Sequence, residues 1–169
     1  PIVKFNSNLN SQKLSPIGIS QGYNSGKSAS VGDSLVLIGS PKDSPNGSNS
    51  GAGYVFVESG DSWSQQAKLT PTDGRPADQF GMSVAVSGDY AIVGAPYSDS
   101  GSTDAGAAYM FVRSGDSWSQ QAKLTPTDGR QADQFGTAVA ISGDYAIVGT
   151  PYSDSGATDS GAAYIFVRS

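Results

Sequence analysis

The sequence predicts an all-β protein, a β-propeller made of three four-stranded blades, and three observations lead to this fold class. Residues 59–113 and 114–168 differ at eight positions, so 47 of their 55 residues are identical. A diverged third copy covers residues 4–58. Each copy consists of short apolar or alternating runs separated by Gly, Pro and Asp, which is typical of strands and turns. No segment has the apolar periodicity of a helix.

Four strands are expected in each unit, taken here from the second copy. Alternation predicts the first strand, and a short apolar run that ends at Gly94 predicts the second. The third strand alternates between two faces, and the fourth follows a second Ser-Gly-Asp turn. The four expected strands are Ser83-Val86, Tyr90-Val93, Ala107-Arg113 and Trp118-Leu124.

A four-stranded unit with short turns fits a propeller blade, because radial repetition leaves only short, protected sheet edges. A β-helix would repeat at a much shorter period, and an immunoglobulin-like sandwich would not repeat itself so closely. We therefore expect one repeat domain, residues 1–169, with blade repeats 4–58, 59–113 and 114–168.

The order of strands at the two ends is staggered. Residues 1–15 align with a fourth strand, since Lys13-Leu14 match Lys68-Leu69, whereas Ala163 to Arg168 is a third strand. The N-terminal strand is thus expected to complete a blade, in cis or in trans. Three interpretations stay open: two chains close a six-bladed ring, the same head-to-tail contact builds a filament, or the segment is a piece of a longer repeat array.

Composition excludes several classes of function. The chain of 169 residues has a net charge of -5 and a pI near 4.4, which argues against binding nucleic acid or acidic membranes. It contains no His and no Cys, so Ser-His-Asp and Cys-His catalysis, His or Cys zinc sites and disulfides are excluded. No apolar run is long enough for a transmembrane helix. We expect a protein that is not an enzyme.

The blade repeats carry a recognisable set of short motifs: Phe80-Gly81, Ser83-Val84-Ala85, Gly94-Ala95-Pro96 and Gly106-Ala107-Ala108-Tyr109. Their order resembles the FG-GAP repeat of integrin α-subunit propellers and bacterial surface proteins. The resemblance covers nearly the whole chain and implies propeller blades, a place outside the cell or on its surface, and relatives that generally have seven blades.

Integrin-type repeats often carry a calcium loop of the Asp-x-Asp-x-Asp-Gly kind between their first two strands. The corresponding junction here, residues 87–90, holds one carboxylate, whereas calcium takes six to eight oxygens. We therefore transfer no metal site and expect no cofactor, although calcium at other carboxylates stays an alternative.

Candidate binding residues lie in the two long loops of each blade, residues 71–79 and 96–105 in the second copy. Strand parity places both loops on one face, and loops on a rigid scaffold often carry binding sites. The candidate residues are Asp73, Arg75, Asp78, Tyr97, Asp99, Asp104, Asp128, Arg130, Asp133, Tyr152, Asp154 and Asp159. The competing interpretation is that these Asp side chains cap their own turns.

Two functions compete on this basis. The favoured hypothesis is a non-catalytic extracellular or surface module for adhesion, assembly or display that associates with itself, and whose further partner is a glycan or a surface protein. The alternative is a lectin-like propeller that binds carbohydrate through its acidic loop face with the help of calcium. Trp63 and Trp118 fit sugar stacking, but one large aromatic residue per blade is better explained by packing between blades.

Overall fold

The computed structural model describes residues 11–19, 22–154 and 156–168. This part of the chain contains β-strands and no helix, which confirms the all-β prediction. The strands are β1 (Ser28–Val31), β2 (Leu35–Ser40), β3 (Ala52–Ser59), β4 (Ser62–Leu69), β5 (Ser83–Ser87), β6 (Tyr90–Ala95), β7 (Ala107–Ser114), β8 (Ser117–Leu124), β9 (Ala138–Ser142), β10 (Tyr145–Thr150) and β11 (Ala162–Val167).

The strands form three antiparallel sheets in chain order. Their orders are β1-β2-β3-β4, β5-β6-β7-β8 and β11-β10-β9, and we call them blade 1, blade 2 and blade 3. Each sheet is a meander, so its first strand lies at one edge. In the described residues blade 3 has three strands, and β11 is its outer edge. This arrangement confirms the prediction of propeller blades.

Sequence explains the local geometry of each blade. Gly88 and Gly115 lie in the tight turns after β5 and β7 with φ of 55° and 61°, values that glycine adopts without strain and that suit two-residue hairpins. A β-bulge follows Val55 in the β3–β4 pair and Met110 in the β7–β8 pair. The bulges leave Gln66 and Gln121 without a strand partner and turn them toward the neighbouring blade.

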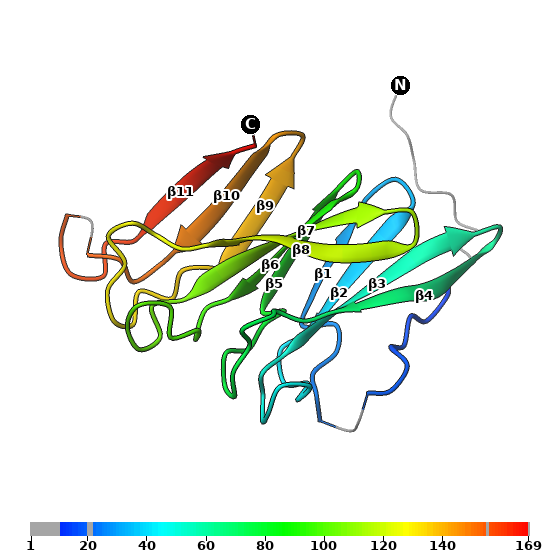
Figure 1. The fold of residues 1–169 in the computed structure, drawn as a ribbon, viewed down its shortest axis with the longest axis horizontal. Coiled ribbons are helices and arrows are strands. Elements are labelled where there is room, and N and C mark those ends of the chain that lie inside the picture. The colour runs from blue at the N-terminus through cyan, green and yellow to red at the C-terminus, as the bar shows by residue number, and fades with distance from the viewer. Residues whose placement is uncertain (1–10, 20–21, 155, 169) are drawn as a thin grey trace.

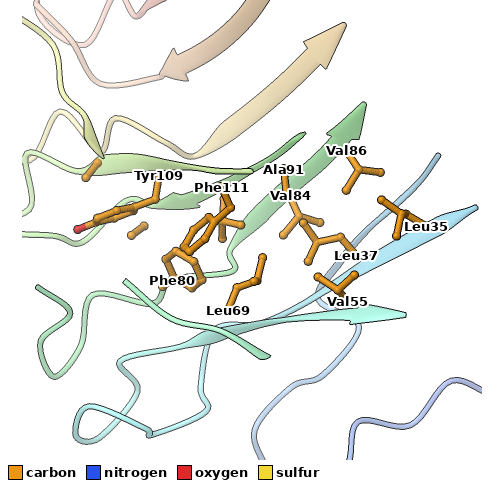
Figure 2. Close-up of a cluster of buried hydrophobic side chains, with 13 residues drawn as sticks. Leu35, Leu37, Val55, Leu69, Phe80, Val84, Val86, Ala91, Tyr109 and Phe111 are labelled. Carbon is orange, nitrogen blue, oxygen red and sulfur yellow. The ribbon is translucent and has the colours of Figure 1, made fainter. Parts of the chain in front are cut away.

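The three sheets stand side by side, with their inner strands close together and their outer strands spread apart (Figure 1). The main apolar core lies between blades 1 and 2. Figure 2 shows Leu35, Leu37 and Val55 of blade 1 facing the side chains of blade 2. A second core joins blade 2 to blade 3 and includes Ile92 and Val148. The hydrophobic core therefore consists of the seams between blades.

The N-terminal part of the chain packs on blade 1. Residues 1–10 lie outside the described residues, and residues 11–19 form no strand, so the expected N-terminal strand is not seen in the described part. Leu14 joins the cluster that contains Ile38 and Phe56. Leu69 makes the equivalent contact one repeat later, with the cluster that contains Val93 and Phe111. Leu14 thus occupies the place of a fourth-strand residue of a preceding blade.

Candidate functional site

The Phe-Gly motif fastens each blade to the one before it. Phe80 forms a parallel bridge with Gly51, and Phe135 forms the same bridge with Gly106. Both phenylalanine side chains are fully buried. Their rings make edge-to-face contacts with the strand-three tyrosines of their own blades, such as Tyr109 at 5.6 Å from Phe80. The motif is therefore a structural contact between blades.

Glycine in the second strand permits the same close approach. A Cβ atom on Gly39 or Gly94 would overlap the carbonyl oxygen of Gly81 or Gly136 in the next blade. The hydroxyl groups of Ser28 and Ser83 donate hydrogen bonds to these two carbonyls, at 2.8 and 2.7 Å. Only glycine fits where the two backbones approach so closely.

Trp118 extends the seam to the outer strands. Its indole Nε1 donates a hydrogen bond of 3.0 Å to Gln66 Oε1 at the bulge of blade 1, and its ring packs on the core between blades 1 and 2. The interpretation of Trp118 as a packing residue agrees with these contacts.

A buried polar cluster in blade 1 was not found by sequence reasoning. Asp43 is buried and accepts a hydrogen bond from the Tyr54 hydroxyl, while Lys68 Nζ lies 2.8 Å from its Oδ2 atom. Lys68 Nζ also lies 5.4 Å from the centre of the Tyr54 ring. Burial opposes ionisation of Asp43, but the hydrogen bonds from Lys68 and Tyr54 outweigh it and lower the pKa of this carboxyl.

Blade 2 pairs its fourth-strand lysine with a carboxylate from another loop. Ser98 stands where blade 1 has Asp43, and Asp73, from the loop before β5, supplies the carboxylate. Lys123 Nζ lies 2.6 Å from Asp73 Oδ2 and 5.4 Å from the centre of the Tyr109 ring. Burial disfavours the charged forms of both Asp73 and Lys123, but their hydrogen bond lowers the pKa of Asp73 and raises that of Lys123.

The signal for this cluster was present in the repeat alignment. Blade 1 combines Gly18 with Asp43, whereas the next repeat combines Asp73 with Ser98 at the corresponding positions. A carboxylate that moves between two loops while the tyrosine and lysine stay in place indicates that the three groups meet in space. The exchange is not visible when each loop is considered by itself, because it involves two loops in each of two repeats.

The predicted loop face exists, and the backbone shows that the two kinds of long loop lie together. Ala77 N donates to Ser48 O at 2.8 Å, and Ala132 N donates to Thr103 O at 2.9 Å. The loop before each Phe-Gly motif therefore lies against the long loop of the preceding blade, and the two kinds of loop lie on one side of the molecule (Figure 1).

Four of the eight candidate carboxylates on this face accept backbone N–H groups of their own turns. Asp78 and Asp133 accept the backbone N–H groups of Arg75 and Arg130, both at 2.8 Å. Asp99 accepts the backbone N–H of Asp104 at 3.1 Å, and its equivalent in blade 3 does the same. These contacts are turn caps.

Some of the remaining candidate residues form pairs, and the others are exposed or half-buried. Asp154 Oδ2 lies 3.5 Å from Arg130 Nη1, and Asp128 accepts the Tyr164 hydroxyl at 2.6 Å. Tyr152 is exposed, and Tyr97 is half-buried. Within residues 11–19, 22–154 and 156–168 no group of three or more acidic side chains is placed to hold a metal ion.

The seam motifs are those that define a known repeat. A model of the FG-GAP repeat matches residues 63–111 and 118–166. The chain belongs to the FG-GAP repeat family. A search of curated proteins found no match. FG-GAP propellers are generally non-enzymatic and are typically found in extracellular or surface proteins. Of the residues described, none belongs to a helix long and apolar enough to cross a membrane.

The two end blades of this FG-GAP chain expose the surfaces that are buried elsewhere in it. Ile147 and Ile165 of blade 3 are 45% and 66% exposed, whereas the equivalent Leu37 and Val55 of blade 1 are fully buried against blade 2. At the opposite end Val31 of blade 1 is 71% exposed, although its equivalent in blade 2 is buried. Each end thus presents one half of a seam.

The glycines show the same asymmetry. A Cβ atom on Gly149 would meet no backbone of a next blade, and a Cβ atom on Gly26 would meet nothing within 4 Å. Their equivalents Gly94 and Gly81 are tightly packed at the internal seams. The seam glycines at the two ends therefore have no partner blade among the described residues, and blade 1 has Ser25 where blades 2 and 3 have Phe80 and Phe135.

Proposed function

We propose that this chain is a non-catalytic FG-GAP propeller module that associates with itself head to tail and serves adhesion, assembly or display at the cell surface. One observation supports the proposal above all. The exposed apolar side chains of blade 3 and blade 1 occupy the positions that form the buried seam between blades 1 and 2. Exposed apolar faces of this kind mark sites of protein association.

The internal seams define how two copies would meet. Blade 3 of one copy would take the part that blade 1 plays against blade 2, so Ile147 and Ile165 would face Val31 of a second copy. Gly149 would then approach the Gly26 carbonyl, as Gly94 approaches that of Gly136. This contact is heterologous, because different surfaces of the two copies meet, so it closes a ring or extends into a filament.

The family supports the surface role. FG-GAP repeats are typical of extracellular and surface proteins, and the polar groups described above are used in packing and turns. A repeated module with two complementary ends is suited to assembly and display. Two copies would make a six-bladed ring, and within a longer protein the same ends would continue a longer array such as a seven-bladed propeller.

The experiment uses Gly149→Ala, measured by light scattering after size exclusion over a concentration series. Blade 3 has room for this methyl group, so the variant is expected to keep the melting temperature of the dilute chain. It would clash with a second copy and leave the protein at the mass of one chain. Wild type is expected to show twice this mass or a larger, concentration-dependent one.

Gly156→Ala is the matched control, because this loop glycine has open space around it and lies away from the seam positions. It is expected to associate as wild type does. A wild-type protein that keeps the mass of one chain at every concentration would contradict the proposal, and so would a Gly149→Ala protein that associates normally.

A further inference from the structure

We propose that the N-terminal segment of a second copy adds to β11 as the fourth strand of blade 3, and that its Lys13 completes a polar cluster with Asp128 and Tyr164. This inference rests on the self-association proposed above and names the residues that one copy contributes to the other. Four observations carry it: strand register, an incomplete cluster, the position of residues 11–19 and an apolar groove.

The register of the complete blades predicts the partner of Lys13. Tyr54 pairs with Lys68 in blade 1, and Tyr109 pairs with Lys123 in blade 2. Lys13 occupies the same repeat position as these two lysines, followed by leucine in all three cases. A strand from the second copy in this register places Lys13 opposite Tyr164.

The cluster in blade 3 lacks the basic group that the other blades have. The Tyr164 hydroxyl donates to Asp128 Oδ1 at 2.6 Å. Asp43 and Asp73 each form an ion pair with the fourth-strand lysine of their own blade, at 2.8 and 2.6 Å. Among the described residues Asp128 forms no ion pair. Lys13 is exposed, so its ammonium group is accessible to a partner.

Residues 11–19 already lie where the end of a fourth strand, and the loop that follows it, would lie in a blade before blade 1. The backbone N–H of Ile17 donates to Gln65 Oε1 at 2.7 Å, as that of Thr72 donates to Gln120 Oε1 one repeat later. Gln12 and the backbone of Trp63 are joined by two hydrogen bonds, of 3.0 and 2.8 Å. The segment is thus held on blade 1 at the place where blade 3 of a second copy would dock.

An apolar groove between blades 2 and 3 marks the missing strand independently. It has a volume of about 240 Å³ and is lined by residues that include Met110, Gln121 and Phe166. At the complete seam Trp118 bonds to Gln66, the equivalent of Gln121, and packs on the core that contains Val55 and Phe111. The groove therefore lies where a fourth strand of blade 3 would place a side chain.

Main-chain hydrogen bonds along β11 would anchor the added strand. The second copy is thus the occupant that the register, the charge and the groove all indicate.

A charge exchange tests the inference in the full chain. We expect Lys13→Glu to weaken self-association about tenfold or more, since a carboxylate would then face Asp128. Asp128→Lys should weaken it similarly, and a chain that carries both substitutions should regain most of the association. Lys42→Glu is the matched control, because it changes the net charge equally on an exposed loop residue. Melting temperatures of the dilute variants verify that each one folds.

A cross-link gives a second readout that needs no change of charge. Val55 pairs with Ala67, and Met110 pairs with Ala122, so Ile165 is expected to pair with Gln12 of the second copy. Opposed strand residues have the Cα separation that a disulfide requires. The chain has no cysteine, so a Gln12→Cys, Ile165→Cys chain should form disulfide-linked species on oxidation, whereas a Gln12→Cys, Lys42→Cys control should not.

The outcomes separate this inference from the function on which it rests. Loss of association on either single charge reversal, with recovery in the double variant, supports it. If both charge-reversal variants associate as wild type does and no cross-link forms, the inference is overturned, but the proposed function is not contradicted. A wild-type chain that never associates overturns both.

Discussion

At the scale of single residues, the fourth-strand lysine of a blade needs a carboxylate partner, but this carboxylate can come from either of two loops. Asp43 in blade 1 and Asp73 in blade 2 come from different loops, yet each forms an ion pair with the fourth-strand lysine of its blade. A charged group on the rim of the core needs a partner, and the two loops are alternative sources of it.

Asp43→Asn is expected to lower the free energy of unfolding at neutral pH by about 2 kcal/mol, since hydrogen bonds to a charged group are lost. The lowered pKa of Asp43 means that its contribution is complete above the pH range in which an unfolded aspartate titrates, and is lost as pH falls through the lower, folded-state pKa. Urea titrations of both proteins should therefore converge at strongly acidic pH. An equal difference at every pH would contradict this assignment.

The exchange of carboxylates between loops predicts a rescue in blade 2. Asp73→Asn alone should destabilise the protein, because Lys123 loses its partner. Adding Ser98→Asp places a carboxylate where blade 1 has one and should restore most of the loss, whereas Ser98→Asp alone brings two carboxylates together and should be unfavourable. A double-mutant cycle of unfolding free energies measures this coupling. Additive effects would show that the two positions do not share the lysine.

The loop-face carboxylates lead to a prediction about calcium. Asp78, Asp99 and their repeat equivalents accept backbone N–H groups in their own turns. We expect millimolar calcium to leave the melting temperature unchanged, because a ligand stabilises only when it binds the folded state. Magnesium serves as the control for ionic strength. A rise specific to calcium, abolished by Asp99→Ala with Asp154→Ala, would revive the lectin-like alternative.

At the scale of elements, the fourth strands differ in what their tryptophans contact. Trp118 packs in the seam between two blades and bonds to Gln66, whereas Trp63 packs on a smaller cluster of blade 1, beside a groove, and its indole makes no described hydrogen bond to a neighbouring blade. Trp118→Ala should therefore cost about 3 kcal/mol of unfolding free energy, and Trp63→Ala clearly less. Chemical unfolding of the dilute protein compares the two. Equal costs would mean that the seam does not anchor Trp118.

Sequence patterns were sufficient to predict the strands but not the seams. The tight turns and alternating runs predicted the strands around Gly88 and Gly115 because these signals are local. The buried contact of Gly94 with the Gly136 carbonyl joins residues of different repeats, so it cannot be predicted from the sequence of one repeat. The sequence is compatible with two roles for the loop-face aspartates, turn cap or ligand. Their hydrogen bonds to backbone N–H groups are seen only in the structure, and these identify turn caps. The Asp73–Lys123 pair spans two elements in the same way.

At the scale of the whole molecule, equivalent surfaces form the seams between neighbouring blades, and each end of the chain carries one such surface without a neighbouring blade. Blade 2 is covered on both faces, whereas blade 1 and blade 3 each expose one. Because the end surfaces are repeat equivalents of the internal seam, the proposed contact between chains would gain free energy in the way that the seam between blades 1 and 2 does. The proposed assembly would therefore depend on side chains equivalent to those that hold the blades together.

Ile147→Lys separates these two roles. Ile147 is 45% exposed, so a lysine there should leave the dilute chain close to wild-type stability, with its charged end in water. In an assembly the same lysine would be buried in an apolar seam and should prevent association. Wild type is expected to show a melting temperature that rises with protein concentration, because association stabilises by mass action. The variant should lose this dependence. Leu37→Lys, at the equivalent buried position, should instead destabilise the chain at every concentration, and a variant Ile147→Lys that did the same would show that this face already packs within one chain.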